Sequence, residues 1–484
     1  MFLMRIKILK PIASVTQVNK LKTIKMKKIF IFLLIMTACL KVAMAHSFPD
    51  FKPLRYDEDY SFLNKDSSNE NWYKKTKYSP LSKNGNTYLT FGGEARLQYF
   101  RVKNESWGDE TPDSDGYVLV RYLVHSDLHV TKYFRAFVQL QGSMINGKAS
   151  TSPVDEDPLD LHQAFVDFNA NPEAQTKVMF RLGRQELSYG SQRLIAVRDG
   201  PNNRQAFDAI KAVVSHTGYK ADFFYSHYVA AKKGIFDDGW NKNSQFWGSY
   251  WVINKVPVLQ NIDAYYLGIW KRKATFDDGS GREIRHSIGS RIWGKKYDFK
   301  YDLEGLYQFG DFDGKPIKAW TASANVSYEL KQIKYKPELG FKAEFISGDK
   351  KKGDDKLQTF DPLFPRGAYF GLAALIGPVN LIDIHPSLSF ELCPKLDWSM
   401  DYDIFWRYSI HDGLYATNGS MLYTGQSSDE KYIGNQLSTE FVYTPEQFLY
   451  LRAEFTWFEA GSYLKDVSAG KNILFAGITA QIKF

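Results

Sequence analysis

The sequence predicts an all-β fold, a single transmembrane antiparallel β-barrel of about eighteen strands with short periplasmic turns and long extracellular loops. Three observations predict it: an export leader, segments of alternating apolar and polar residues that recur to the last residue, and gaps that alternate between short and long. Successive side chains of a strand point to opposite faces, so each segment has one apolar and one polar face. A closed barrel in lipid needs both, because its outside meets hydrocarbon and its lumen meets water.

The N-terminus carries the features of an export signal. A basic stretch at 26–28 precedes an apolar run at 29–40, and an Ala-Met-Ala cleavage site follows shortly after. The run is too short to span a membrane, so residues 1–45 are predicted to be a signal peptide that is removed. The residues before Met26 fit either a misassigned upstream start or a long basic region. A second interpretation takes 36–39 as a poor lipobox for lipid attachment.

Removing this leader changes the charge and the cysteine count. The whole chain has a formal net charge of +8, and residues 1–45 hold nine Lys or Arg and no acid, so the remainder carries 8 − 9 = −1. The basic total therefore gives no reason to expect nucleic acid as a partner. Of the two cysteines only Cys393 remains, which excludes an intramolecular disulfide and a cysteine-based metal site.

The chain after the leader divides into two parts. Residues 46–87 are rich in Asn, Asp, Ser and Lys and are predicted to form an irregular periplasmic segment, and residues 88–484 to form the barrel. Alternation is clearest at the C-terminus, where Thr479, Gln481 and Lys483 oppose a row of aliphatic residues. Strands of this length suit a tilted membrane crossing. They are predicted near 88–100, 117–130, 132–143, 160–169, 176–184, 205–217, 219–229, 244–254, 261–272, 283–294, 298–310, 316–330, 333–346, 379–392, 395–408, 431–444, 447–459 and 471–484.

The gaps between these segments alternate in length. Short gaps indicate tight turns at 217–218, 330–333, 393–394 and 444–446, and long gaps indicate loops at 101–116, 144–159, 185–204, 230–243, 347–378 and 409–430. Short turns at one end and long loops at the other are typical of an outer-membrane barrel, and a barrel of this size encloses a lumen rather than a packed core. A soluble β-sandwich or propeller is the alternative fold, but the sequence has no blade-length repeat.

The polar face of the segments gives the residues predicted to line the lumen, because a basic side chain facing lipid costs a few kcal/mol near mid-bilayer. They are Glu94, Arg96, Arg121, His125, Asp127, Arg135, Asp167, Arg181, Lys211, Asp302, Glu304, Glu329, Lys342, Glu344, Asp403, Arg407, Glu440, Arg452 and Glu454. One interpretation is a self-neutralising network that fills a wide lumen. The other is a conduction path in which arginines bind anions and acids keep that binding weak enough for release.

Several motifs resemble those of one family. The stretch 181–195 reads RLGRQEL.YG.QRLI, 202–211 reads N.R.AFDAIK, 360–371 reads FDPLFPRGAYFG, and the chain closes on AGITAQIKF. Together they resemble the alginate export family of outer-membrane porins over essentially the whole chain after the leader. The resemblance implies an eighteen-stranded barrel with an arginine-rich constriction through which a linear acidic polysaccharide leaves the periplasm. It also implies that 360–371 is a loop near the mouth, and the two prolines there favour a fixed path.

The resemblance also implies a set of substrate-binding and pore-lining residues. Matched positions are Arg184, Gln185, Glu186, Arg193, Arg204 and Asp208, with weaker matches at Arg96, Arg121 and Arg407. Arg135, Arg181, Lys211 and Arg452 complete the predicted pore lining. A guanidinium presents a planar fork that suits the carboxylates of uronate residues. The alternative is that Arg184, Glu186 and Asp208 pair only to hold a loop.

The function predicted from these features is passive export or diffusion of an anionic, alginate-like polysaccharide through an arginine-lined pore. The alternative is a general or anion-selective nutrient porin of the same fold with another substrate. An outer-membrane enzyme is not favoured, because His162, His216 and His227 have no recognisable serine partner. An energised receptor is not favoured either, because about forty residues before the first strand are too few for a plug and such transporters have more strands. The predicted partners are the anionic solute, outer-membrane lipid, lipopolysaccharide and periplasmic proteins of an export complex.

No cofactor is predicted. Asp-Gly pairs near 237–239, 277–279 and 311–314 invite a loop calcium interpretation, but none has the twelve-residue EF-hand pattern. Turn chemistry explains these pairs without a metal. The charged run at 349–356 reads as a solvated loop or a lipopolysaccharide contact. The sequence contains neither H-E-x-x-H nor G-x-S-x-G.

Overall fold

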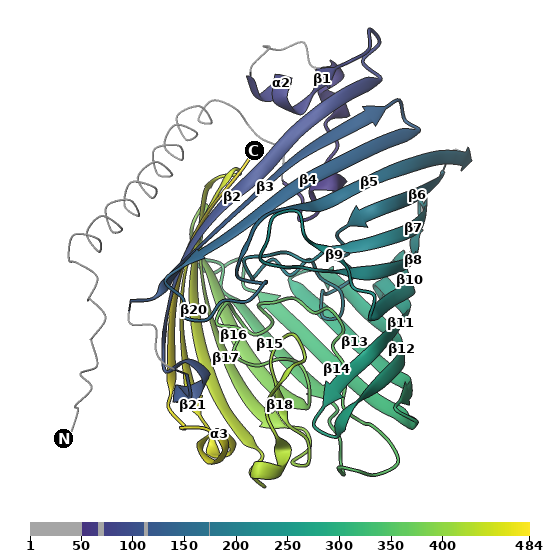
Figure 1. Cartoon of the computed structure of the whole chain (residues 1–484). Coiled ribbons are helices and arrows are strands. Elements are labelled where there is room, and N and C mark those ends of the chain that lie inside the picture. Colours follow the sequence, from purple (N-terminus) through teal and green to yellow (C-terminus); the bar gives the residue numbers. More distant parts are fainter. Residues whose placement is uncertain (1–50, 66–71, 111–114, 174) are drawn as a thin grey trace, which may run out of the picture. The chain divides into compact units, whose positions relative to one another are not determined.

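The structure is a computed structural model that describes residues 51–65, 72–110, 115–173 and 175–484. The predicted signal peptide at 1–45 lies outside these residues. One antiparallel sheet closes on itself into a barrel (Figure 1). Of its twenty strands, β1 (Ser79–Pro80) and β9 (Gly239–Trp240) are two-residue additions, and the other eighteen form the wall.

The wall strands follow one another around the barrel in sequence order, and the last pairs with the first, with Ala95 opposite Ile482. They are β2 (Thr87–Lys103), β3 (Tyr117–Val130), β4 (Phe134–Asn146), β5 (Asp157–Glu173), β6 (Thr176–Gln185), β7 (Phe207–His216), β8 (Tyr219–Ala230), β10 (Ser244–Val256), β11 (Gln260–Phe276), β12 (Gly279–Lys296), β13 (Phe299–Phe312), β14 (Lys315–Glu329), β15 (Glu338–Ile346), β16 (Leu381–Cys393), β17 (Leu396–Arg407), β20 (Tyr432–Glu446), β21 (Leu449–Ala460) and β22 (Ile473–Lys483).

The predicted fold class and strand number are confirmed, and each predicted segment corresponds to one wall strand. The largest difference is at β15, which begins at Glu338 although the sequence predicts a start at 333. Residues 330–337 form a turn there, in which the N–H of Leu330 donates to the carbonyl of Pro337 at 2.8 Å. Tyr335 and Lys336 have φ of 68° and 44°, outside the range of regular strand backbone. The alternation of Tyr335 with its neighbours therefore does not signal a strand.

The outer face of the wall is apolar, as the alternation predicts. Ile478, Ile210 and Phe180 are 61%, 60% and 55% exposed, whereas Thr479 beside Ile478 is 4% exposed. Outward rows of Ile, Phe and Leu would be unfavourable in water but are suited to acyl chains. The part of the chain that the structure describes contains no helix that is long and apolar enough to cross a membrane.

The two ends of the barrel differ. We call the end where β3–β4, β7–β8 and β16–β17 are joined by short connections the turn end, and the opposite end the loop end. The loop end carries the elements η3 (Glu105–Gly108), β18 (Leu414–Tyr415), β19 (Met421–Tyr423), η4 (Gly425–Ser427) and α3 (Ser462–Val467). The connections β11–β12 and β13–β14 are tight even at this end, because these strands extend further than the sequence predicts.

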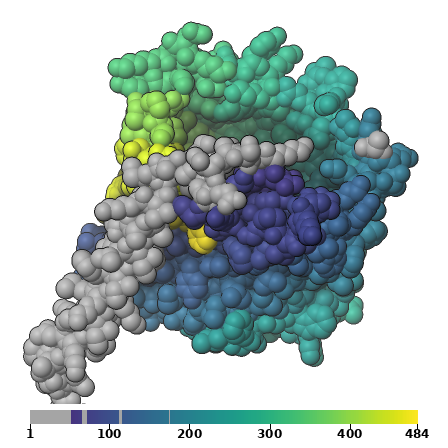
Figure 2. Space-filling view, turned by 90° about the horizontal axis from the view of Figure 1, so that it is seen from above, coloured from purple at the N-terminus to yellow at the C-terminus, as the bar shows by residue number. Residues whose placement is uncertain are grey.

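The N-terminal segment closes part of the turn end. It contains η1 (Arg55–Asp57), η2 (Ser61–Lys65), α2 (Trp72–Lys77) and β1, which pairs with β2. The Arg55 guanidinium donates to the carbonyls of Gly93 and Phe484, both at 2.9 Å. These bonds join the segment to the first wall strand, β2, and to the residue that follows the last, β22. The Tyr56 ring enters the lumen and packs edge-on against Phe165. Figure 2 shows this segment across one side of the opening, with a hollow beside it.

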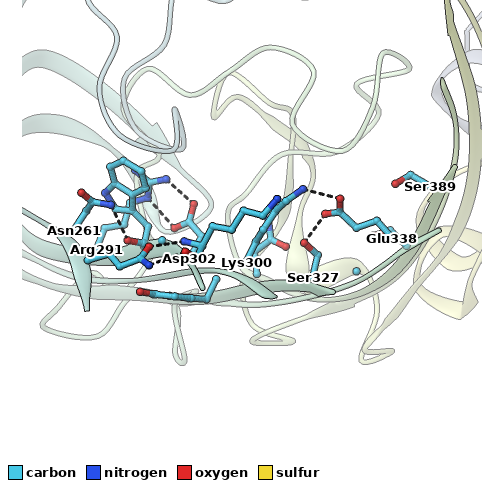
Figure 3. Close-up of a pocket in the computed structure, with 15 residues that line it drawn as sticks. Asn261, Arg291, Lys300, Asp302, Ser327, Glu338 and Ser389 are labelled. Carbon is cyan, nitrogen blue, oxygen red and sulfur yellow. Dashed lines mark hydrogen bonds and ion pairs between the residues drawn. The ribbon is translucent and has the colours of Figure 1, made fainter. Parts of the chain in front are cut away.

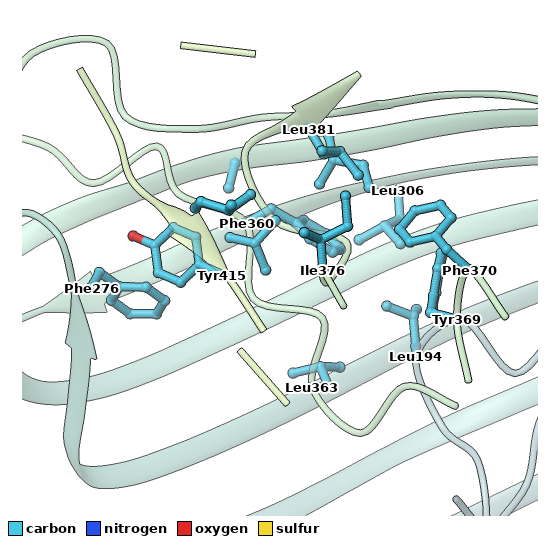
Figure 4. Packing of buried hydrophobic residues seen from close by; sticks show 14 of the residues in the cluster. Leu194, Phe276, Leu306, Phe360, Leu363, Tyr369, Phe370, Ile376, Leu381 and Tyr415 are labelled. Atoms are coloured by element: carbon cyan, nitrogen blue, oxygen red, sulfur yellow. The ribbon is translucent and has the colours of Figure 1, made fainter. Parts of the chain in front are cut away.

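Two long loops from the loop end fold into the lumen. We call residues 186–206 the first inner loop and residues 347–380 the second inner loop. They pair with each other where the N–H of Ala196 donates to the carbonyl of Phe364 at 3.0 Å. Leu194, Leu363 and Ile376 of these loops pack with wall residues such as Leu306 in a buried apolar cluster (Figure 4). The expectation of a lumen without a packed core is thus wrong at this level, because the loops bring their own apolar side chains inside.

Candidate functional site

The hollow near the turn end is polar but internally neutralised. It has a volume of about 540 Å³ and is lined by residues of β11 to β16 (Figure 3). Arg291 donates two hydrogen bonds to the Asp302 carboxylate, each 2.7 Å long, and Lys300 pairs with Glu338 at 2.6 Å. Each of these cations has its own carboxylate. This hollow therefore behaves as a wet vestibule rather than as a site for a charged ligand.

A second cavity is rich in cations. It has a volume of about 350 Å³ and lies between the wall and the two inner loops; we call it the cationic cavity. Its lining residues are Arg96, Gln98, Gln192, Asp199, Gly200, Arg366, Gly367, Ala368, Leu372, Tyr450, Arg452, Thr479, Gln481 and Lys483.

The wall of the cationic cavity is the seam where the barrel closes. Gln481 on β22 lies opposite Arg96 on β2 and opposite Tyr450 on β21, and directly opposed residues share one face of a sheet. Thr479 lies opposite Arg452 in the same way, and its hydroxyl accepts a hydrogen bond of 3.0 Å from Gln98. Alternation along three adjacent strands thus directs this polar set into the lumen.

The cations of this cavity differ in how they are paired. Arg452 forms ion pairs with Glu440 and Glu454. Arg96 donates instead to the carbonyls of Asp199 at 2.5 Å and Pro201 at 2.7 Å. A carbonyl carries no net charge, so the charge of this guanidinium is not neutralised by these bonds.

Two further cations in the cationic cavity are less constrained. Arg366 is exposed and donates to the carbonyl of Tyr369 at 3.3 Å. Within the described part of the chain, neither Arg366 nor Lys483 forms an ion pair with a carboxylate. These two side chains are therefore available to an anionic ligand.

Asp199 is the acidic residue that lines the cationic cavity. Its carboxylate lies 2.6 Å from Arg121, which also pairs with Glu94 at 2.7 Å. Enclosure in the lumen raises the pKa of the Asp199 carboxyl, but Arg121, Arg204 and Arg96 lower that pKa by more, so it falls below its ordinary value. Asp199 is therefore ionised and offsets part of the positive charge. A negatively charged ligand therefore meets cations whose positive charge is only partly neutralised.

Comparison with known proteins assigns the family. The sequence pattern of the family described as alginate export matches residues 87–471. The chain belongs to the alginate export family. A comparison with curated protein sequences gave no match. As a member of this family with a closed eighteen-stranded wall, the protein is a β-barrel porin of the bacterial outer membrane, so the turn end faces the periplasm and the loop end faces outward.

Solved structures support the fold. OccD3 (OpdP) of Pseudomonas aeruginosa superposes with a TM-score of 0.57 at 11% identity, over 85% of this chain and 93% of that chain. OccK2 (OpdF) of the same organism, solved in complex with glucuronate, gives 0.54 at 10% identity over 82% and 98%. OccAB1 of Acinetobacter baumannii gives 0.54 at 11% identity over 85% and 99%. At these identities the similarity shows a shared barrel fold and nothing about the solute.

The structure brings only some of the predicted site residues of this alginate export barrel together. Arg96 and Arg452 line the cationic cavity, and Arg121 lies directly behind it. Arg135 and Arg181 belong instead to a ladder with Asp127 and Asp167, in which Arg181 donates to Asp167 at 2.7 Å and 2.8 Å. This part of the wall forms the predicted self-neutralising network.

The first inner loop holds three more of the predicted residues, Glu186, Arg193 and Arg204. Arg204 pairs with Glu186 at 2.8 Å, and His162 contacts the same carboxylate at 2.8 Å. Gln185, at the end of β6, is buried and donates to the carbonyl of Ala209 at 3.3 Å. Lys211 on β7 has Asp222 at 3.8 Å. These contacts fix the base of the loop and leave little of it free for a ligand.

Two of the predicted pore positions face away from the lumen. Arg184 lies opposite Asp208 across β6 and β7, and the two form an ion pair at 2.9 Å. Both alternate with outward residues, since Leu182 is 53% and Ile210 is 60% exposed. The prediction that Arg184 and Asp208 line the pore is wrong, because strand parity puts them on the outer face near the loop end. Arg184 and Asp208 pair with each other at the rim, whereas Glu186, the third residue of the predicted loop-holding set, pairs with Arg204.

Arg407 also has a structural rather than a pore-lining position. It is fully buried, and its guanidinium donates to the carbonyls of Ile410 at 2.8 Å and Ser428 at 2.6 Å. The ring of Tyr463 lies 4.0 Å from the guanidinium carbon. This arginine organises the loop after β17, and the prediction that it lines the pore is wrong.

Sequence reasoning missed Arg366 and Lys483 as site residues, although both stand in motifs that carry the family resemblance. Arg366 belongs to FDPLFPRGAYFG and Lys483 to the closing strand. Alternation with Thr479 and Gln481 predicts that Lys483 faces the lumen. The inward path of the loop that carries Arg366 was not readable, because no alternation pattern governs a loop.

Among the described residues of this alginate export barrel, two clusters bring metal-ligand atoms together. Asp157, Asp160 and Asp238 meet at the loop end, and Asp383, His385 and Asp403 meet on the lumen wall. Burial raises the pKa of the Asp238 carboxyl to about 6, and the backbone N–H of Lys232 opposes this shift. Asp238 is one of the residues for which the sequence suggests a loop calcium, and the all-oxygen set suits that ion.

Proposed function

We propose that this outer-membrane channel conducts an anionic, uronate-containing saccharide and that the cationic cavity is its selectivity site. The observation that supports the proposal is the grouping of Arg96, Arg366, Arg452 and Lys483 around one cavity whose lining contains a single acid, Asp199. Guanidinium groups bind carboxylates through paired hydrogen bonds. The amides and hydroxyls of the same lining suit the hydroxyl groups of a sugar.

The acids near the cavity support conduction rather than tight capture. Glu440 and Glu454 pair with Arg452, and Asp199 approaches Arg121, so that each carboxylate competes with a bound anion. A channel needs binding that favours the solute yet permits release. Arginines that are only partly neutralised attract an anion and still allow its release.

A second candidate is a porin for small anionic solutes. A cavity of about 350 Å³ encloses a small ligand rather than a polymer, and the inner loops bound it in this conformation. OccK2, which has the same architecture, was solved with glucuronate, a single uronate unit. A polymer exceeds this cavity, so its passage requires the inner loops to move.

We also propose how the chain is processed and which molecules it contacts. Residues 1–45 would be removed on export, 46–87 would form the periplasmic segment and 88–484 the barrel. The proposed partners beyond the solute are outer-membrane lipid, lipopolysaccharide and periplasmic proteins of an export complex. Membership of a porin family and the absence of any recognisable catalytic motif in the sequence favour a transport function without catalysis.

The test uses purified protein in planar lipid bilayers under a KCl gradient. We expect a zero-current potential that indicates anion preference, and a reduction of the current by soluble oligouronates. Blockade that strengthens from one unit to many supports the polymer, and blockade that is complete with monomeric glucuronate supports the nutrient porin. Cation preference together with indifference to every uronate would exclude both.

Charge reversal tests the residues themselves. Arg366→Glu combined with Lys483→Glu should shift the zero-current potential towards cation preference and relieve blockade. Arg184→Glu is the control for each of the two single reversals, because it makes the same change of charge on the outer face and should leave selectivity unchanged. Equal effects of the two changes would show that the cationic cavity does not set selectivity.

A further inference from the structure

A second chemically distinctive site lies on the lumen wall, on the adjacent strands β16 and β17. Asp383 and His385 project from β16 and Asp403 from β17. One ligand atom from each of the three lies within 4.8 Å of the others. The Asp383 side chain is 0% exposed and that of Asp403 is 1% exposed, so water does not screen these charges.

Four polar atoms that converge at this site have no hydrogen-bond partner among the described residues. Both carboxylate oxygens of Asp383, Oδ1 of Asp403 and Nδ1 of His385 are buried without a hydrogen-bond partner among the described residues. Nδ1 of His385 lies 2.7 Å from Oδ1 of Asp403, but the contact does not have hydrogen-bond geometry. Lys342 Nζ and His385 Nδ1 each stay 3.9 Å from Oδ2 of Asp383. Leaving buried carboxylates in this state is costly unless a cation joins them.

The surroundings orient the same three side chains. Nε2 of His385 lies 3.0 Å from Oδ1 of Asp401. An imidazole that donates Nε2–H to this carboxylate presents the lone pair of Nδ1 to the cluster. Gln436 donates to Oδ2 of Asp403 at 3.2 Å, which leaves Oδ1 of that carboxylate directed at His385. A carboxylate behind a histidine and a donor behind a carboxylate are the usual supports of a protein metal site.

The backbone pairing between β16 and β17 is interrupted beside this site. The ladder between β16 and β17 has no paired residues between Ile384 with Ile404 and Ser387 with Asp401. Pro386 lies in this gap and has no N–H to donate. A metal ion bound by residues of both strands would join them where the hydrogen-bond ladder is interrupted.

We propose that Asp383, His385 and Asp403 bind one divalent transition-metal ion, with Zn²⁺ as the best fit. An imidazole nitrogen selects for such ions over Mg²⁺ and Ca²⁺, and two carboxylate oxygens complete a three-ligand set that zinc accepts with a fourth position open. The ion neutralises two buried carboxylates and links β16 to β17. This site is independent of the cationic cavity and of the identity of the transported solute.

The test uses untagged protein refolded without lipopolysaccharide and stripped with a chelator. We expect titration with ZnCl₂ to show one bound equivalent per barrel by calorimetry and elemental analysis, and to raise the temperature of unfolding, while CaCl₂ in its place does neither. A wild-type protein that binds no Zn²⁺ and shows no shift in unfolding temperature would overturn the proposal, and would indicate a proton on His385 in place of the metal.

Variants separate metal binding from simple packing. Asp383→Asn and Asp403→Asn should abolish the bound equivalent. Asp401→Asn should weaken binding on the order of 10- to 100-fold, because Asp401 orients the His385 ring. Without metal, Asp383→Asn should unfold at a higher temperature than the wild type, because it removes a buried carboxylate charge that no hydrogen bond satisfies. His286→Gln and Asp302→Asn, which lie away from the cluster, should keep full binding. Unchanged binding in Asp383→Asn would place the ion elsewhere.

Discussion

Arg193 of the first inner loop lies with its Nε 3.2 Å from Oε1 of Glu344 on β15. The same guanidinium donates to the hydroxyl of Tyr369 at 2.8 Å and to that of Thr321 at 3.0 Å. One residue therefore joins the first inner loop, the second inner loop and the wall. Asp199 of the same loop contacts Arg121 on β3, so the loop is fastened at two separate parts of the wall.

Arg193→Gln should release this connection and raise the single-channel conductance. The side chain of Glu344 is 0% exposed, and removing one partner of a buried pair costs roughly 3 kcal/mol. Lys342, 3.3 Å from Glu344, limits the loss by keeping that carboxylate partly neutralised. Conductance in planar bilayers and the denaturant midpoint of unfolding measure the two effects. Unchanged conductance with a lowered midpoint would mean that the loops stay in the lumen without this link.

Tyr56 gives a second test of what occupies the lumen. Its ring is buried between Phe137 and Phe165, and its hydroxyl donates to the carbonyl of Glu186 at 2.8 Å. Tyr56→Phe removes only the hydrogen bond and should cost about 1 kcal/mol. Tyr56→Ala removes the ring as well, should cost about 3 to 5 kcal/mol, and should raise conductance. Equal conductance in both variants would show that the ring does not restrict the path.

A substitution at the outer rim should leave transport unchanged. Arg184→Ala breaks the ion pair with Asp208 but touches no lumen residue, so selectivity and conductance should stay at wild-type values. The Arg184 side chain is 14% exposed and also donates to the carbonyl of Leu161 at 3.0 Å, so the unfolding midpoint should fall by the equivalent of roughly 1 to 2 kcal/mol. Bilayer recordings beside denaturant titration in lipid vesicles provide the measurement. A changed selectivity would contradict the outward placement.

The sequence predicts the strands of the wall but not the paths of the loops inside it. Alternation is a local property, so the parity of Arg96, Thr479 and Lys483 follows from their neighbours alone. The same rule places Arg184 on the outer face with Leu182, although the family motif that contains Arg184 suggests a pore-lining position. Arg407 follows the rule and points inward, yet a loop covers it, and no local pattern reports that cover.

Loop paths depend on long-range contacts that a sequence does not display. The pairing of Ala196 with Phe364 joins residues that are far apart in the chain, and it brings Arg366 beside the seam of the barrel. The convergence of Asp383 with Asp403 likewise depends on the register between two strands. Residue types suggested arginines as the binding groups, but only the register and the loop path decide which arginines remain available.

The N-terminal segment gives a prediction about pH. The Lys77 ammonium is fully buried and has no hydrogen-bond partner among the described residues, and its Nζ lies 4.9 Å from the centre of the Tyr60 ring. Burial lowers the pKa of Lys77 from 10.5 to about 7, with Arg55 adding to the decrease and Glu58 opposing it. The detached segment exposes this lysine to water, where its pKa returns to the ordinary value.

The direction of the effect follows from proton counting. Between pH 7 and 10.5 the detached segment holds a proton on Lys77 that the docked segment has lost, so docking strengthens as the pH rises through this window and weakens as it falls towards 7. Hydrogen exchange of residues 72–80, corrected for the intrinsic dependence of exchange on pH, should show protection increasing from pH 7 to 10. Lys77→Met should give high protection at pH 7 and remove the dependence, because a neutral side chain of similar length fills the same site. A wild-type protein whose protection is flat across this window would show that Lys77 stays charged when the segment is docked.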